Sequence, residues 1–212
     1  ALKYEQTRYL LSRSLETKKE VPLNLVDDQL YIGYQKGSVT LYALRDYIGE
    51  QRLNGELKNF MQYYSYREAP YPTSDDLLKN IDRAVPDSMK YLVADFFKTI
   101  TVYSNRIDSA TCKQNGKSWE ISVASTIQKF RADSIGKQME VTPNDWLNVG
   151  VYTTSTKGSD SLIFTSRVKA NSKKFHFNLL VDRKPVKVKI DPQHLLIDRD
   201  LDDNAKEVKK KG

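Results

Sequence analysis

The apolar residues of this chain change their spacing near residue 100. Before that point they recur every three or four positions, as do Leu41, Leu44 and Ile48, which is the spacing of an amphipathic helix. After it they alternate with polar residues, as in 119–127, which is the spacing of a strand with one buried face. The change predicts an α+β protein with two modules: a helical bundle over 1–104 and a β-sandwich over 105–197. We expect 198–212, which is rich in charge, to form a flexible tail.

The helical part contains clear start and stop signals. Gly49 is suited to end a helix, and Thr73-Ser74-Asp75-Asp76 offers a capping-box start. The hydroxyls there can accept hydrogen bonds from free backbone amides, and the acidic groups suit the positive end of the helix. The predicted helices cover 1–15, 37–48, 50–65, 73–85 and 87–99.

The β part contains turn signals between short apolar runs. Asn115-Gly116 predicts a hairpin, because both residue types tolerate the positive φ of a type I′ turn. A strand is predicted directly after it, and others are predicted over 162–168, 175–181 and 186–190. Several short strands with turns between them are typical of an antiparallel β-sandwich.

Composition excludes several classes of protein. The net charge is +7 over 212 residues, but the basic residues are spread along the chain and form no known nucleic-acid motif, so we expect no nucleic-acid partner. No apolar run approaches the ~18 residues that a membrane helix needs. Cys112 is the only cysteine, which excludes an internal disulfide. The N-terminus has neither an initiator Met nor a signal pattern, so we expect a processed chain or a segment of a longer one.

One short motif points to chemistry. Tyr34-Gln35-Lys36-Gly37 leads into the predicted helix 37–48, and it resembles the Y-x-K-G-A/S signature of the aminopeptidase N family of zinc metallopeptidases, the gluzincins. The resemblance extends through 31–50 and through 71–78. It is closest to bacterial members whose peptidase region is joined to an ABC-transporter permease. It covers 1–104 well and the β part more loosely.

The resemblance implies a function for the parent protein and a limit for this chain. The 1–104 module would be the C-terminal part of a gluzincin catalytic domain, and the parent would remove N-terminal residues from peptide substrates. Tyr34 would stabilise the oxyanion formed during hydrolysis. The family binds zinc through H-E-x-x-H and a later Glu, which this chain lacks. We therefore expect the zinc ligands in the missing N-terminal half, and expect this chain alone to bind no zinc and cleave no peptide.

Other residues with catalytic or metal-binding chemistry have structural explanations. His176 alternates out of phase with the apolar residues of its predicted strand, and His194 lies in a loop after the last predicted strand. Neither has zinc-ligand spacing, and Cys112 is distant in sequence. Lys36 is predicted to make a local contact or face solvent, and Gly37 to allow close approach of backbone. We assign no metal ligand or cofactor-binding residue in this chain.

Two other interpretations stay open. In one, the parent has lost its zinc site and uses both modules for extracytoplasmic interactions of a membrane-anchored protein. In the other, the chain is an unrelated adaptor. A bundle that lines one wall of a cleft would expose apolar surface where the rest of the parent packs. We therefore expect self-association through that face in the isolated chain.

Overall fold

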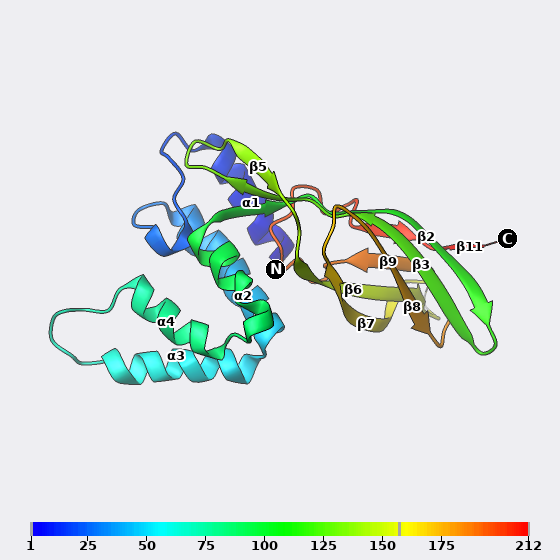
Figure 1. The fold of residues 1–212 in the computed structure, drawn as a ribbon, viewed down its shortest axis with the longest axis horizontal. Coiled ribbons are helices and arrows are strands. Elements are labelled where there is room, and N and C mark those ends of the chain that lie inside the picture. Colours follow the sequence, from blue (N-terminus) through cyan, green and yellow to red (C-terminus); the bar gives the residue numbers. More distant parts are fainter. Residues whose placement is uncertain (1, 157, 212) are drawn as a thin grey trace. The chain divides into compact units, whose positions relative to one another are not determined.

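The computed structural model describes residues 2–156 and 158–211 and has an α+β fold (Figure 1). The chain divides into two compact units. Unit 1 comprises Ala1–Thr101 and Arg131–Gln138, and unit 2 comprises Val102–Phe130 and Met139–Gly212. The sequence indicated a single boundary at 104, whereas the structure returns the short segment 131–138 to unit 1.

Unit 1 contains the helices, at positions close to those predicted. The capping box at the start of α4 is present, with the Thr73 amide donating to the Asp76 carboxylate at 3.0 Å. Gly49, with φ of 95°, separates α2 from α3 as predicted. The helices are α1 (Leu2–Leu15), α2 (Gly37–Ile48), α3 (Glu50–Tyr64), α4 (Ser74–Ala84) and α5 (Tyr91–Val93), with π-helical turns at Tyr31–Lys36 and Ala94–Lys98 and 3₁₀ turns at Leu23–Leu25 and Asp87–Met89.

Helix α1 buries a different face from the one its leucines suggest. Its buried residues are Gln6 and Tyr9, while Leu11 and Leu15 are exposed. Tyr9 is buried because its ring stacks on Tyr31, with ring centroids 5.8 Å apart. None of the helices in the described residues is both long enough and apolar enough to cross a membrane.

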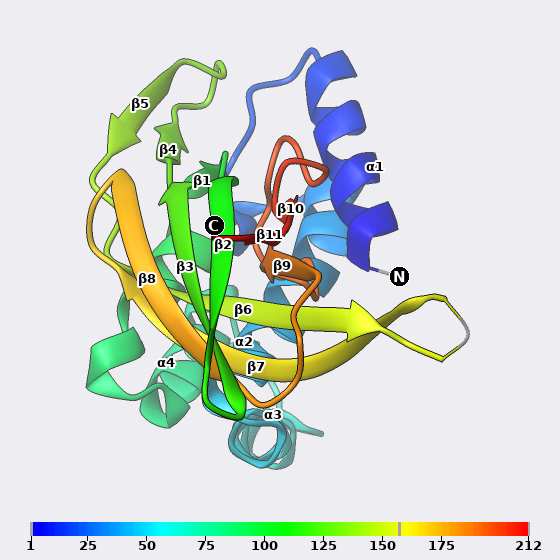
Figure 2. The ribbon, with the colours of Figure 1, turned by 90° about the vertical axis from the view of Figure 1, so that its right-hand side faces the viewer.

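Unit 2 contains two four-stranded sheets, with strand orders β10–β9–β6–β7 and β11–β2–β3–β8 (Figure 2). Within them every pairing is antiparallel except that of β11 with β2, which is parallel. Their strands are β2 (Arg106–Asn115), β3 (Ser118–Thr126), β6 (Asp145–Thr154), β7 (Asp160–Ala170), β8 (Lys174–Val181), β9 (Lys187–Ile190), β10 (Ala205–Glu207) and β11 (Lys209–Lys210). A third sheet has the order β1 (Ile100–Tyr103), β4 (Lys129–Ala132) and β5 (Gln138–Val141).

The core of unit 2 follows the alternation that the sequence predicted. Ile121 and Val123 of β3 are buried, and so are Val188 and Ile190 of β9. Strand β6 also buries alternate apolar residues, although the sequence analysis predicted no strand there. Its Gly150 packs closely, since an added Cβ would lie 3.2 Å from the Leu162, Pro192 and Tyr152 side chains, which would then have to shift by a few tenths of an ångström.

The predicted hairpin forms one residue later than expected. Asn115 pairs with Ser118 in the β2–β3 ladder, so the loop residues are Gly116 and Lys117. Gly116 has φ of 61°, and Asn115 stays in the strand. Positive φ at the first loop residue alone is a property of type II′ turns, in which Gly holds that position.

Residues 198–211 differ from the flexible tail that was predicted over 198–212, and Gly212 lies outside the described residues. Asp198 is buried and accepts a hydrogen bond from the Asn105 amide at 3.0 Å. Farther along, β10 pairs with β9 and β11 pairs with β2. The charged composition misled the prediction because lysines on an edge strand can extend into water while their backbone pairs.

Candidate functional site

Tyr34 lies in the π-helical turn Tyr31–Lys36, which continues directly into α2. The Gly37 amide donates to the carbonyl of Ile32, five residues earlier, as the π-helix requires. Such turns are rare, and they occur frequently at functional sites. The Tyr34 side chain is 68% exposed, and its hydroxyl has no hydrogen-bond partner in the described part of the chain. The phenol therefore faces solvent and not the core.

Two leucines are exposed near Tyr34 along the same helical segment. Leu30 precedes Tyr34 by four residues and is 67% exposed, and Leu41 follows it by seven and is also exposed. Residues at these spacings share one face of a helix. Ser38, four residues after Tyr34, lies on the same line, and its hydroxyl donates to the carbonyl of Gln35 at 3.0 Å.

Lys36 lies on the opposite side of the same turn and is almost completely buried, with 1% of its surface exposed. Its Nζ donates to the carbonyl of Thr99 at 3.3 Å and lies 5.8 Å from the centre of the Tyr9 ring. Burial lowers the pKa of Lys36 to about 8. We expected Lys36 to make a local contact or to face solvent, and this expectation is wrong. Its spacing from the buried Ile32, Val39 and Ala43 was the signal that could have revealed this.

Gly37 does not have the role that was expected for it. Its φ of −59° is helical, so it has no need of the left-handed region. An added Cβ would lie 3.7 Å from the nearest atoms, which is an ordinary contact. Neither the backbone conformation nor the available space requires glycine here.

A zinc ion does not fit the described residues of this chain. Among them, no group of three or more His, Cys, Asp and Glu side chains is placed to hold a metal ion. His176 is exposed on β8, and His194 lies in the loop after β9 with φ of 60°. Cys112 is buried on β2, and burial raises the pKa of its thiol, which makes it less reactive.

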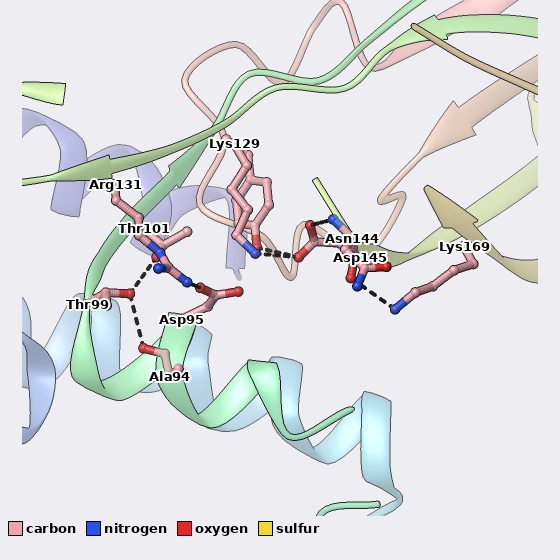
Figure 3. A network of polar contacts seen from close by, with 10 residues as sticks. Ala94, Asp95, Thr99, Thr101, Lys129, Arg131, Asn144, Asp145 and Lys169 are labelled. Atoms are coloured by element: carbon pink, nitrogen blue, oxygen red, sulfur yellow. Dashed lines mark hydrogen bonds and ion pairs between the residues drawn. The ribbon is translucent and has the colours of Figure 1, made fainter. Parts of the chain in front are cut away.

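Sequence reasoning missed the buried ionic groups, several of which Figure 3 draws. In unit 1, Arg131 Nη2 lies 3.1 Å from Oδ1 of the fully buried Asp95. Nearby, the Thr99 hydroxyl donates to the carbonyl of Ala94 at 3.0 Å and lies 2.7 Å from the Thr101 hydroxyl. These contacts fix the π-helical turn Ala94–Lys98 and the start of β1.

In unit 2, the carboxylate of Asp145 binds a buried lysine (Figure 3). Lys129 Nζ lies 2.9 Å from Asp145 Oδ1, and the Tyr103 hydroxyl donates to the same oxygen at 3.2 Å. The Asn144 amide donates to Oδ2 at 2.9 Å. Because the carboxylate accepts several hydrogen bonds from the protein, this group is a structural ion pair and not a general base.

No protein-family model matches this chain, and no curated protein matches it.

Proposed function

We propose that this chain is the C-terminal part of a gluzincin zinc aminopeptidase, in which Tyr34 stabilises the oxyanion of the reaction. In this proposal the helices of unit 1 belong to the catalytic domain's helical bundle, and the two four-stranded sheets of unit 2 form a β-sandwich. The observation that carries the proposal is the geometry of the Y-x-K-G turn. Tyr34 points to solvent from a π-helical turn, while Lys36 holds that turn to the core.

The chemical argument rests on the rigidity of this phenol. During peptide hydrolysis, negative charge develops on the oxygen of the scissile carbonyl. A hydroxyl held at hydrogen-bond distance from that oxygen stabilises the transition state more than the ground state. Tyr34 is suited to this task because its backbone lies within a continuous helix and its hydroxyl is not engaged by the described residues.

Zinc would be bound by the parent protein outside this chain. The described residues do not fit the ion, so we derive no step through it. The chain's partners in this proposal are the missing N-terminal half and, in the complete enzyme, the peptide substrate. The apolar line of Leu30 and Leu41 beside Tyr34 is the surface that the N-terminal half would cover.

The test is Tyr34→Phe in the complete parent protein, with Tyr42→Phe as the matched control. Tyr42 is also exposed and lies on α2, into which the π-helical turn of Tyr34 continues, but it does not belong to the motif. Loss of one oxyanion donor lowers kcat about 10²- to 10³-fold, and KM should change little. A kcat that is unchanged in Tyr34→Phe would remove this residue from the mechanism.

A second test uses this chain alone. We expect purified material to contain far less than one zinc per chain by elemental analysis and to release no amino acid from peptide substrates. Stoichiometric zinc or peptidase activity would contradict the assignment of the zinc ligands to another part of the parent.

One observation favours a second candidate, a non-catalytic interaction module of a membrane-associated protein with a degenerate peptidase domain. The exposed aromatic residues of unit 1, such as Tyr66 and Tyr71, are typical of binding surfaces. The two candidate functions predict different sequences in the parent before residue 1. An H-E-x-x-H motif followed by a Glu supports the enzyme, and its absence supports the interaction module.

A further inference from the structure

Unit 1 contains a pocket of about 340 Å³ on a different part of its surface from Tyr34. The end of α1, the loop after it, Tyr31 and the turn between β4 and β5 form its walls. Figure 1 shows this loop beside that turn, and the Glu20 amide donates to the carbonyl of Ser134 at 2.9 Å. Its volume is near the lower end of the range of about 300–1,000 Å³ that is usual for ligand pockets.

Two buried polar atoms of the pocket's side chains lack partners. Arg13 and Tyr31 both line the pocket, and Arg13 Nη2 and the Tyr31 hydroxyl are buried without a hydrogen-bond partner in the described residues. The neighbouring Glu20 forms no hydrogen bond with either atom: one of its carboxylate oxygens accepts from the Tyr9 hydroxyl and the other from Arg13 Nε. Unsatisfied buried donors are rare in native proteins, and a bound group outside the chain is one explanation.

The charges around the pocket favour an anion. Arg13 lines the pocket and forms an ion pair with Glu20, and the buried Lys36, which does not line the pocket, lies close enough to both for their charges to interact. The pKa of Lys36, which burial lowers to about 8, still leaves it protonated at neutral pH. Lys19 lines the pocket as an exposed cation and forms no ion pair in the described part of the chain. The acidic Glu16 and Glu20 also line it and would repel a doubly charged ligand.

We propose that this pocket binds a small organic carboxylate. The carboxylate would accept hydrogen bonds from Arg13 and Tyr31, and its apolar part would contact Leu10 and Ile135, which also line the pocket. A single negative charge matches the excess of one buried cation. The proposal does not depend on the role of Tyr34, because Tyr34 belongs to a separate, exposed face of the same helical segment.

The experiment titrates the ¹⁵N-labelled chain with sodium benzoate and, separately, with benzamide at constant ionic strength. We expect benzoate to shift the amide resonances of Glu20 and of 134–136, and benzamide to shift them far less. Tyr31→Phe keeps the ring that stacks on Tyr9 and removes only the hydroxyl. It should weaken benzoate binding at least about tenfold, because hydrogen bonds to charged groups are strong.

Two charge variants provide a matched pair. Lys19→Gln removes a cation at the pocket and should weaken benzoate binding about two- to fivefold. Lys58→Gln removes the same charge from the exposed surface of α3, and it should leave the affinity unchanged. Because Lys19 is exposed, its variant tests the proposal even if Tyr31→Phe does not fold.

Several results would overturn the proposal. Benzamide could bind as tightly as benzoate, the pocket amides could fail to shift, or Lys19→Gln and Lys58→Gln could weaken binding equally. Unchanged benzoate affinity in a folded Tyr31→Phe protein would have the same consequence. Inorganic phosphate that binds more tightly than benzoate would contradict the choice of a monoanionic carboxylate.

Discussion

Unit 1 and unit 2 differ in where they hold their large apolar side chains. Among the described residues, unit 1 exposes thirteen such side chains, whereas unit 2, of nearly equal length, exposes only Met139, Leu162 and Leu180. Single exposed leucines are normal on any protein. In unit 1, however, the exposed residues share helix faces: Tyr4, Leu11 and Leu15 on α1, and Leu30, Tyr34 and Leu41 along the segment that ends in α2.

The two units also differ in the partners of a buried lysine. Lys129 of unit 2 forms an ion pair with the buried Asp145. Lys36 of unit 1 is buried as deeply but forms no ion pair in the described residues and donates only to a carbonyl. Unit 2 therefore exposes few large apolar side chains and pairs its buried Lys129 with a buried carboxylate. Unit 1 exposes more apolar side chains and leaves its buried Lys36 without an ion pair in the described residues, which supports the proposal that it contacts molecules outside this chain.

The largest expected effect is on the ion pair of unit 2. Lys129→Met leaves the Asp145 carboxylate buried without its cation, which should lower the free energy of unfolding by about 3–5 kcal/mol. Both tryptophans, Trp119 and Trp146, belong to unit 2, so tryptophan fluorescence during urea unfolding measures the change. The control is Lys173→Met, whose partner Glu140 is exposed, with an expected loss below about 1 kcal/mol. Equal losses in the two variants would show that Lys129 is not desolvated.

The second expected effect concerns Lys36, whose replacement should raise the stability of the protein, whereas replacement of Lys129 should lower it. Its folded pKa of about 8 lies below the unfolded value of 10.5, so the unfolded state binds more protons between these values. The stability of the wild-type chain should therefore rise with pH through this window. Below it, Lys36→Met should be the more stable protein, by on the order of 3 kcal/mol, because it avoids burying a charge.

The measurement is urea unfolding followed by far-UV circular dichroism, which reports the helices of unit 1, between about pH 7.5 and about pH 9.5. The wild-type protein should gain stability over this range and Lys36→Met should not. Lys58→Met, at an exposed position on α3, should retain the wild-type slope. A wild-type stability that is flat with pH would mean that Lys36 keeps an ordinary pKa.

Local signals predicted most of the elements. The periodicity of 37–48 and the capping residues at Thr73 and Asp76 act within one or two turns, and the structure reproduces the predicted starts of α2 and α4 closely. Strand β6 was missed although Leu147, Val149 and Val151 alternate. Its Gly150 is unusual inside a strand, and the Leu162 and Pro192 side chains pack closely against it.

The site depends on contacts that a local pattern does not contain. The sequence suggested Tyr34 through a motif. The residue lies in a π-helical turn, in which a backbone amide bonds to the carbonyl five residues earlier, and the spacing of apolar residues does not indicate such a turn. Lys36 is buried against Thr99, and Lys129 against Asp145, across long stretches of chain. The role of Tyr34 as an oxyanion stabiliser stays a prediction.

The third expected effect tests the exposed face of unit 1. If the isolated chain associates through this face, Leu30→Lys should weaken the association about tenfold or more, because burial of a leucine contributes about 1.5–3 kcal/mol. Sedimentation equilibrium measures the dissociation constant. The matched control is Leu180→Lys, an exposed leucine of unit 2, which should leave it unchanged. If Leu180→Lys weakens the association and Leu30→Lys does not, the interface belongs to unit 2.

The smallest expected effect is at the start of α4 in unit 1. The Thr73 hydroxyl lies 3.0 Å from the Asp76 carboxylate, and the hydrogen bond from the Thr73 amide lowers the pKa of Asp76 to about 2. Thr73→Ala should lower the stability of unit 1 by about 1 kcal/mol, and Thr73→Ser should not. The circular dichroism midpoint should move, while the tryptophan midpoint of unit 2 should move only if the two units unfold together. Equal shifts of both midpoints would mean that unit 1, despite its exposed apolar faces, unfolds as one cooperative body with unit 2.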